Sequence, residues 1–138
     1  MSDKKRIVIT GMGIASCLGN DVDTFYNNLL GGVSGIAPIN SFPCEDYPTR
    51  FAGAIKDLDT EGYLDKKQAR RVDPYISYSI VSGKKALEMA ELDGDKLEGI
   101  DKKKCGILIG SGMGGMGVFS NGVEALINRG FKIGRAHV

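Results

Sequence analysis

Arg6-Ile-Val-Ile-Thr10 and Gly106-Ile-Leu-Ile109 are two short apolar runs, and a glycine-rich loop follows each of them directly. The loops read Gly11-Met-Gly-Ile-Ala-Ser-Cys-Leu-Gly19 and Gly110-Ser-Gly-Met-Gly-Gly-Met-Gly117. A short run rich in β-branched residues that ends at glycine is typical of a buried strand that enters a tight turn. We therefore predict two buried strands, and we expect most of these glycines to serve the close packing of turn, sheet and helix.

Helix signals lie after both loops. Asn20-Asp21 offers an N-cap for a helix over Val22 to Leu30, and Gly31-Gly32 ends it. Helical spacing of apolar residues predicts a second helix from Val118 to about Arg129. Between them, residues 33–50 hold three prolines and predict irregular structure, and Arg50 to Ile55 predicts a short strand.

The clearest helix start is Asp73 as N-cap with Pro74 in the first helical position. This helix is predicted to run to about Leu92. Its expected buried stripe is Ile76, Ile80, Gly83, Leu87 and Ala90. The alternation of strands and helices predicts an α/β fold with a mostly parallel sheet and packed helices. Two clear strands are few for such a sheet, which has about 5–6 on average, so we expect an incomplete part of a larger fold.

Composition excludes several classes of protein. The 138 residues carry 18 Lys and Arg against 17 Asp and Glu, a net charge of +1, which does not suit a nucleic-acid-binding arm. No apolar run approaches the roughly 20 residues that span a bilayer, and no signal peptide is visible. The one histidine, His137, excludes a metal site built on two histidines within this chain.

Three features of the sequence bear on its possible chemistry: a glycine motif, the cysteines and a basic run. The segment Gly110-Ser-Gly-Met-Gly-Gly115 matches the G-x-G-x-x-G pattern of a dinucleotide-binding turn, so an NAD(P)-dependent oxidoreductase is one alternative. Cys17, Cys44 and Cys105 form no C-x-x-C pair and have no internal histidine as a base, which favours structural thiols in a reducing compartment. The basic run Lys102-Lys103-Lys104 indicates a solvated turn or a docking site for an acidic partner.

Seven segments in order resemble the N-terminal part of the β-ketoacyl-[acyl-carrier-protein] synthases. They are Arg6 to Ser16, Leu18 to Asp21, Ser34 to Ile36, Arg50 to Gly53, Arg70 to Asp73, Ser82 to Leu87 and Gly110 to Gly115. The resemblance runs from about Lys5 to Phe131, and the synthase I/II type of condensing enzyme is the most similar variety. It implies a thiolase-like fold, of which this chain would be an incomplete N-terminal half.

The resemblance implies a decarboxylative Claisen condensation in fatty acid elongation, in which an acyl thioester on a cysteine is attacked by malonyl-carrier thioester. The family's nucleophilic cysteine and its two histidines lie in later motifs that this sequence lacks. No catalytic residue is therefore carried over, and the 138-residue chain is expected to be inactive. The one site carried over is substrate-binding: Met113, with Gly112 and Gly114, would line and gate the acyl pocket. An unbranched, adaptable side chain suits that role; ordinary core packing is the alternative for Met113.

The last residues depart from the family. After Lys132 the chain reads Ile133-Gly-Arg-Ala-His-Val138, which one choice of codons matches to the start of a sequencing adapter. We expect residues 1–132 to be a truncated part of the synthase N-terminal domain and residues 133–138 to be a non-native tail; a natural divergent terminus is the alternative.

For the full-length parent the resemblance implies acyl carrier protein as partner, a homodimer, and no metal, cofactor, nucleic acid or membrane. The bacterial cytosol is the expected compartment, with the plastid stroma as the alternative. Two further readings stay open: a non-catalytic relative of the chain-length-factor type, and a standalone binding or scaffold fragment.

Overall fold

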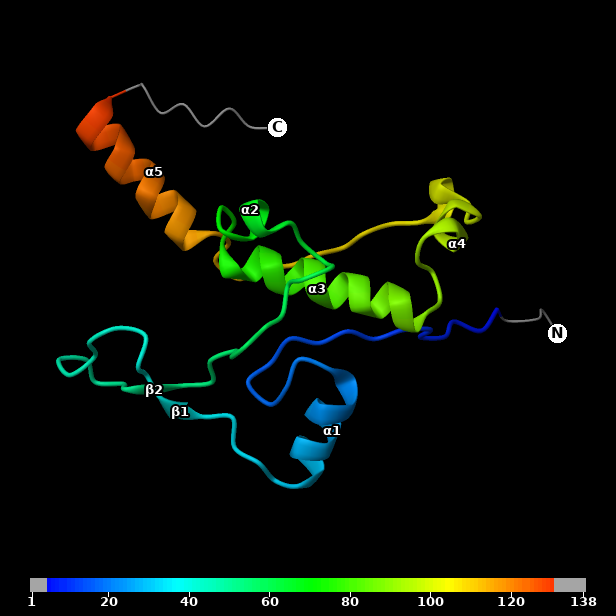
Figure 1. The fold of residues 1–138 in the computed structure, drawn as a ribbon, viewed down its shortest axis with the longest axis horizontal. Coiled ribbons are helices and arrows are strands. Elements are labelled where there is room, and N and C mark those ends of the chain that lie inside the picture. The colour runs from blue at the N-terminus through cyan, green and yellow to red at the C-terminus, as the bar shows by residue number, and fades with distance from the viewer. Residues whose placement is uncertain (1–4, 131–138) are drawn as a thin grey trace.

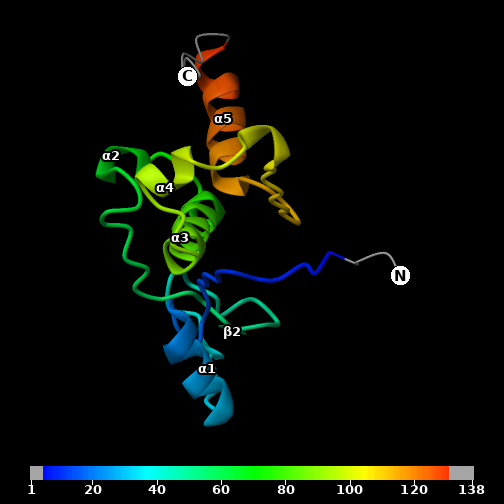
Figure 2. The ribbon, with the colours of Figure 1, turned by 90° about the vertical axis from the view of Figure 1, so that its right-hand side faces the viewer.

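The computed structural model of the protein describes residues 5–130. Its elements in chain order are α1 (Val22–Leu30), β1 (Ala37–Pro38), β2 (Phe51–Ala52), α2 (Lys66–Ala69), α3 (Pro74–Met89), α4 (Asp95–Glu98), the 3-10 helix η1 (Lys102–Lys104) and α5 (Met116–Arg129). Helix α3 lies at the centre, α1 and the two strands lie on one side of it, and α5 projects away from it on the other (Figures 1 and 2).

Helix α1 has the predicted bounds because local chemistry specifies both of its ends. The Asp21 carboxylate accepts a hydrogen bond of 2.8 Å from the N–H of Thr24, which satisfies a free donor of the first turn. At the other end the N–H of Gly31 donates to the carbonyl of Asn27 over 2.9 Å. The predicted helix over residues 22–30 is confirmed.

Helix α3 begins at Pro74 as predicted but ends at Met89, three residues before the predicted end. The predicted buried stripe is wrong. Ser77 and Val81 are the buried residues of this helix, whereas Gly83 and Leu87 are exposed. The glycine loop of residues 11–13 lies against Ser82, Ala86 and Ala90, so the face of α3 that contacts it differs from the predicted stripe except at Ala90. Helix α5 is confirmed and begins two residues earlier than predicted.

The 11–13 loop packs directly on the backbone of α3. A side-chain carbon at Gly11 would overlap the carbonyl oxygen of Ala86, and one at Gly13 would overlap that of Ser82. The N–H of Met12, between them, lies 3.3 Å from the Met89 sulfur. The packing role predicted for these glycines is confirmed in the first loop, where the absence of a side chain lets two backbones meet.

The short strand predicted over Arg50 to Ile55 is present as β2 (Phe51–Ala52), but the two predicted buried strands are not formed. Residues 6–10 and 106–109 are without strand pairing, and their side chains are open to solvent, with Ile7 98% and Leu108 100% exposed. The one sheet of residues 5–130 pairs β1 with β2 antiparallel, Ala37 opposite Ala52. The expected mostly parallel sheet is therefore not formed by the described residues. A strand needs a neighbour for its backbone groups, and no residue of the described range pairs with either run through backbone hydrogen bonds.

The core is small for a chain of this size. Val81 is the largest fully buried side chain among the described residues. The accessible surface is 11989 Å² for 14.8 kDa, whereas a self-contained monomer of that mass exposes about 7,000 Å². The excess of about 5,000 Å² is several times what one partner contributes to a standard protein interface, about 800 Å².

Candidate functional site

The proposed substrate loop lies between the exposed run 106–109 and helix α5. Gly114 turns the backbone with a φ of +66°, a conformation that favours glycine, and the Ser111 hydroxyl accepts a 2.9 Å hydrogen bond from its N–H. Met113 sits at the tip of this turn with 76% of its surface exposed. A side-chain carbon at Gly112 or Gly114 would meet open space. The three predicted site residues thus share one exposed turn.

The start of α5 is held by a residue from another helix. The N–H of Val118 donates to both oxygens of the Asp73 carboxylate, at 3.3 and 3.2 Å. The N-cap position of α5 is Gly115, which has no side chain to offer. Side-chain carbons at Gly115 and Gly117 would both crowd this carboxylate. Asp73 holds the predicted N-cap position of α3, but its side chain makes no cap bond there.

This carboxylate argues against the dinucleotide alternative. A Rossmann-type turn holds a pyrophosphate at the helix N-terminus by means of free N–H groups and the positive end of the helix dipole. In this structure the first turn of α5 already donates to Asp73. A bound diphosphate would have to approach a fixed negative charge, so Gly110 to Gly115 matches the pattern without offering the anion site.

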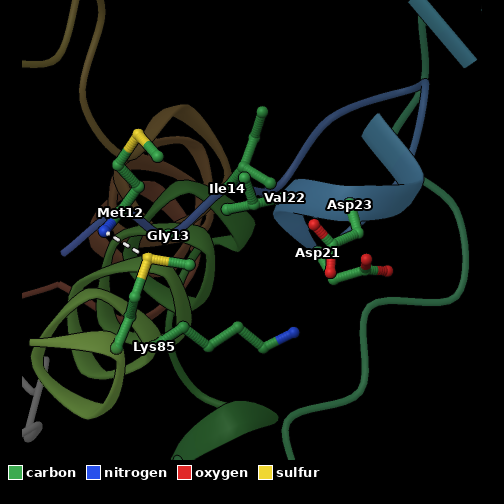
Figure 3. Close-up of a pocket in the computed structure, with 8 residues that line it drawn as sticks. Met12, Gly13, Ile14, Asp21, Val22, Asp23 and Lys85 are labelled. Carbon is green, nitrogen blue, oxygen red and sulfur yellow. Dashed lines mark hydrogen bonds between the residues drawn. The ribbon is translucent and has the colours of Figure 1, made fainter. Parts of the chain in front are cut away.

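A shallow hollow of about 170 Å³ lies between the first glycine loop, the start of α1 and helix α3 (Figure 3). Its lining residues are Met12, Gly13, Ile14, Asp21, Val22, Asp23, Lys85 and Met89. Pockets that enclose a small organic ligand measure about 300–1,000 Å³. The hollow is too small for an acyl chain or a nucleotide.

Helix α3 also anchors two loops through polar groups. The Lys85 ammonium donates to the carbonyl of Asn20 over 2.7 Å and lies 5.7 Å from the centre of the Tyr63 ring. The Tyr63 hydroxyl donates to Glu88 over 2.9 Å, and this hydrogen bond to the carboxylate raises the pKa of the phenol. These contacts fix the segments around residues 20 and 63 to the same helix.

The cysteines occupy three different settings. Cys17 packs against Gly35 and Gly53, Cys44 is buried with its thiol 3.6 Å from the carbonyl of Ile39, and Cys105 is exposed. Residues 5–130 contain no histidine that could act as their base. His137 lies outside the described residues. No cysteine is therefore arranged as an activated nucleophile in this part of the chain.

Residues 5–130 hold no group of three or more His, Cys, Asp or Glu side chains placed to bind a metal ion. None of the helices in that range has the length and apolar character needed to cross a bilayer.

The role of Asp73 is the functional detail that sequence reasoning missed. Its position directly before Pro74 is the usual signature of a cap for the helix that follows. The only signal in the sequence for its actual partner is the pair of glycines at 115 and 117. A glycine at a helix start leaves room for a side chain from elsewhere in the fold.

The chain is similar to one protein family over almost its whole length. The family model described as "Beta-ketoacyl synthase, N-terminal domain" matches residues 4–133. Over 129 residues the chain is 56% identical to 3-oxoacyl-[acyl-carrier-protein] synthase I, chloroplastic, of Arabidopsis thaliana. Over 130 residues it is 42% identical to 3-oxoacyl-[acyl-carrier-protein] synthase 2 of Staphylococcus aureus (strain N315). Each alignment covers 94% of this chain, but the chain spans only 27% and 31% of the two relatives.

Solved structures give the same likeness. A chain of the solved complex titled "AntDE:AntF (apo): type II PKS acyl-carrier protein in complex with its ketosynthase bound to the hexaketide" matches 91% of this chain with a TM-score of 0.66 and 26% identity. The matched region is 32% of that chain. The ishigamide ketosynthase/chain length factor matches 64% of this chain with a TM-score of 0.58 and 25% identity.

Proposed function

The chain belongs to the β-ketoacyl synthase family through its N-terminal domain, and from this premise we propose that the complete protein is a 3-oxoacyl-[acyl-carrier-protein] synthase of fatty acid elongation. The observation that carries the proposal is the 56% identity to a chloroplastic synthase I across nearly the whole chain. The chain-length-factor alternative has less support, because the likeness to a ketosynthase/chain length factor is weaker, at 25% identity.

The proposed reaction joins two thioesters and releases CO2. The acyl group first passes from its carrier to a cysteine thiolate, and the carrier thiol leaves. Malonyl thioester then loses CO2, and the electron pair of the broken bond attacks the acyl carbonyl. The new carbon–carbon bond forms as the cysteine thiolate departs. In the family the thiol and two histidines belong to later motifs, so we propose that the present residues supply the scaffold and part of the acyl pocket.

We propose Met113, between Gly112 and Gly114, as the acyl-contacting residue of this segment. Its side chain is 76% exposed at the tip of a tight turn, so it is available to an alkyl chain or to walls contributed by other segments. Three rotatable bonds and a polarizable sulfur let methionine follow a flexible hydrocarbon. The neighbouring glycines leave the space beside it open.

The unpaired runs 6–10 and 106–109 are the observation behind our proposal of a larger sheet in the complete protein. Both are extended chains of β-type residues with exposed backbones, the form a strand takes before it meets its neighbours. We propose that they enter one mostly parallel sheet of a thiolase-like fold. In this proposal residues 1–132 are a truncated part of the N-terminal domain. The non-native origin of residues 133–138 also stays a proposal, because residues 131–138 lie outside the described range.

The proposed partner is acyl carrier protein, and its support is the likeness to a ketosynthase solved in complex with its carrier protein. The proposed complete enzyme is a homodimer that needs no metal or cofactor. Relatives from a chloroplast and from a bacterium support the plastid stroma and the bacterial cytosol as the two candidate compartments.

Two experiments test the function. Independent DNA read past the codon for Lys132 should continue into a synthase frame with a cysteine codon at the nucleophile position. A residue other than cysteine there would favour the chain-length-factor type, and a genuine stop codon after Val138 would remove the proposal of a non-native tail.

The second experiment joins residues 5–130 to the remainder of the Arabidopsis synthase I and measures release of labelled CO2 from malonyl-carrier in the presence of acyl-carrier. We expect turnover by this chimaera and none by the 138-residue chain. In the chimaera, Met113→Phe should shift the preference toward shorter acyl chains. A soluble, folded chimaera without turnover would contradict the proposed function of this segment.

A further inference from the structure

Asp73 makes a contact that its own helix does not need. Its carboxylate lies at the start of α3 but makes no cap bond there, and Pro74 has no N–H to offer. Both oxygens instead accept from the N–H of Val118, 45 residues further along the chain. The carboxylate thus serves the first turn of α5.

The helix that receives this carboxylate is built for it. Its N-cap residue is glycine, so no local side chain satisfies the free N–H groups of the first turn. A side chain at Gly115 or at Gly117 would collide with the Asp73 carboxylate. The negative charge also lies at the positive end of the helix dipole. The helix dipole, the free N–H groups and the space left by the two glycines therefore all favour a carboxylate at this position.

The same contact fixes the end of the substrate loop. Met113 stands two residues before Gly115, and the turn between them is tightened by the bond from the Gly114 N–H to the Ser111 hydroxyl. Among residues 5–130, no other hydrogen bond joins this loop or the start of α5 to helix α3. Movement at Gly115 is therefore passed directly to the Met113 side chain.

We propose that Asp73 is a positioning residue: by capping α5 from the neighbouring helix, it sets where Met113 stands in the acyl pocket and thereby the acyl-chain preference of the enzyme. The effect on acyl-chain preference rests on the proposed function. The capping of α5 by Asp73 does not depend on that function.

The structural half is tested in the 138-residue chain by amide hydrogen exchange. Asp73→Ala should speed exchange at the Val118 amide by roughly 2- to 30-fold, the change that corresponds to loss of one helix cap. Asp73→Asn keeps an acceptor oxygen and should restore most of the protection. Asp95→Ala, at an exposed aspartate in α4, is the matched control and should leave Val118 unchanged. Faster exchange in the first turn of α3 with Val118 unaffected would overturn the inference.

The functional half is tested in the chimaera with acyl-carrier substrates of different lengths. Asp73→Ala should change the ratio of kcat/KM between long and short acyl chains, while the KM for malonyl-carrier stays constant; Asp73→Asn should recover the original ratio. An equal loss for all lengths would indicate a merely structural role and overturn the inference. An unmutated chimaera without turnover would instead refute the proposed function, and the exchange at Val118 would still decide whether Asp73 anchors α5.

Discussion

Leu108→Ala should have almost no effect in the 138-residue chain and a large effect in a complete enzyme. Leu108 is fully exposed in the structure, at 100%. Removing exposed apolar atoms changes the free energy of unfolding by no more than about 0.5 kcal/mol. If the run 106–109 enters a buried sheet in the complete fold, the same substitution costs about 2–5 kcal/mol there.

Val81→Ala provides the matched control, because Val81 is 0% exposed in the chain as it stands. The lost methyl groups and the cavity should cost about 2 kcal/mol in both contexts. The assay is urea unfolding followed by helical circular dichroism, on the 138-residue chain and on the chimaera with the Arabidopsis remainder. A loss above about 1 kcal/mol for Leu108→Ala in the short chain would mean that this run is already buried. No loss in the chimaera would mean that it never enters the core, and either result would refute the reasoning.

Three further predictions follow from single contacts. Gly13→Ala should destabilise the 11–13 loop on α3 by about 1–3 kcal/mol, because the new carbon overlaps the Ser82 carbonyl; Gly106→Ala, which meets open space, should be neutral or slightly stabilising in the same urea assay. The Thr24 N–H that donates to the Asp21 carboxylate holds its pKa below the usual 3.8, so the cap is present above that pH and is lost as the pH falls through the lowered value. The chemical shift of the Thr24 amide should therefore change more below pH 3.8 in the native chain than in Asp21→Asn, and a pH-independent Thr24 amide in the native chain would contradict this. Aromatic disulfide reagents should modify exposed Cys105 first and buried Cys44 last; equal rates for the two thiols before urea is added would show that the core around Cys44 is open.

The helices could be predicted because their ends are decided by neighbours in the sequence. Asp21 and Gly31 bound α1, and Pro74 begins α3, all within a few residues of the bond or turn that matters. The strands could not be predicted in the same way. Ile7 and Leu108 have strand-forming character, but pairing depends on a second segment, and residues 5–130 place none beside them.

The candidate site was predictable in part for the same reason. The tight turn around Gly114 follows from its glycines and Ser111 alone. The link from Asp73 to Val118 joins residues 45 positions apart, so the local sequence predicted the N-cap position of Asp73 on α3 but not the contact of its carboxylate with α5. Whether Met113 faces an acyl chain depends on walls that these residues do not form, so that part stays a prediction.

The dependence of the first loop on α3 has a consequence for synthesis on the ribosome. Met12 meets Met89, which is 77 residues later in the chain. At elongation rates of about 5–20 residues per second, the nascent loop waits about 4–15 seconds for its binding surface to be made. During that interval Gly11 and Gly13 lack the backbone of α3 against which they pack in the folded chain.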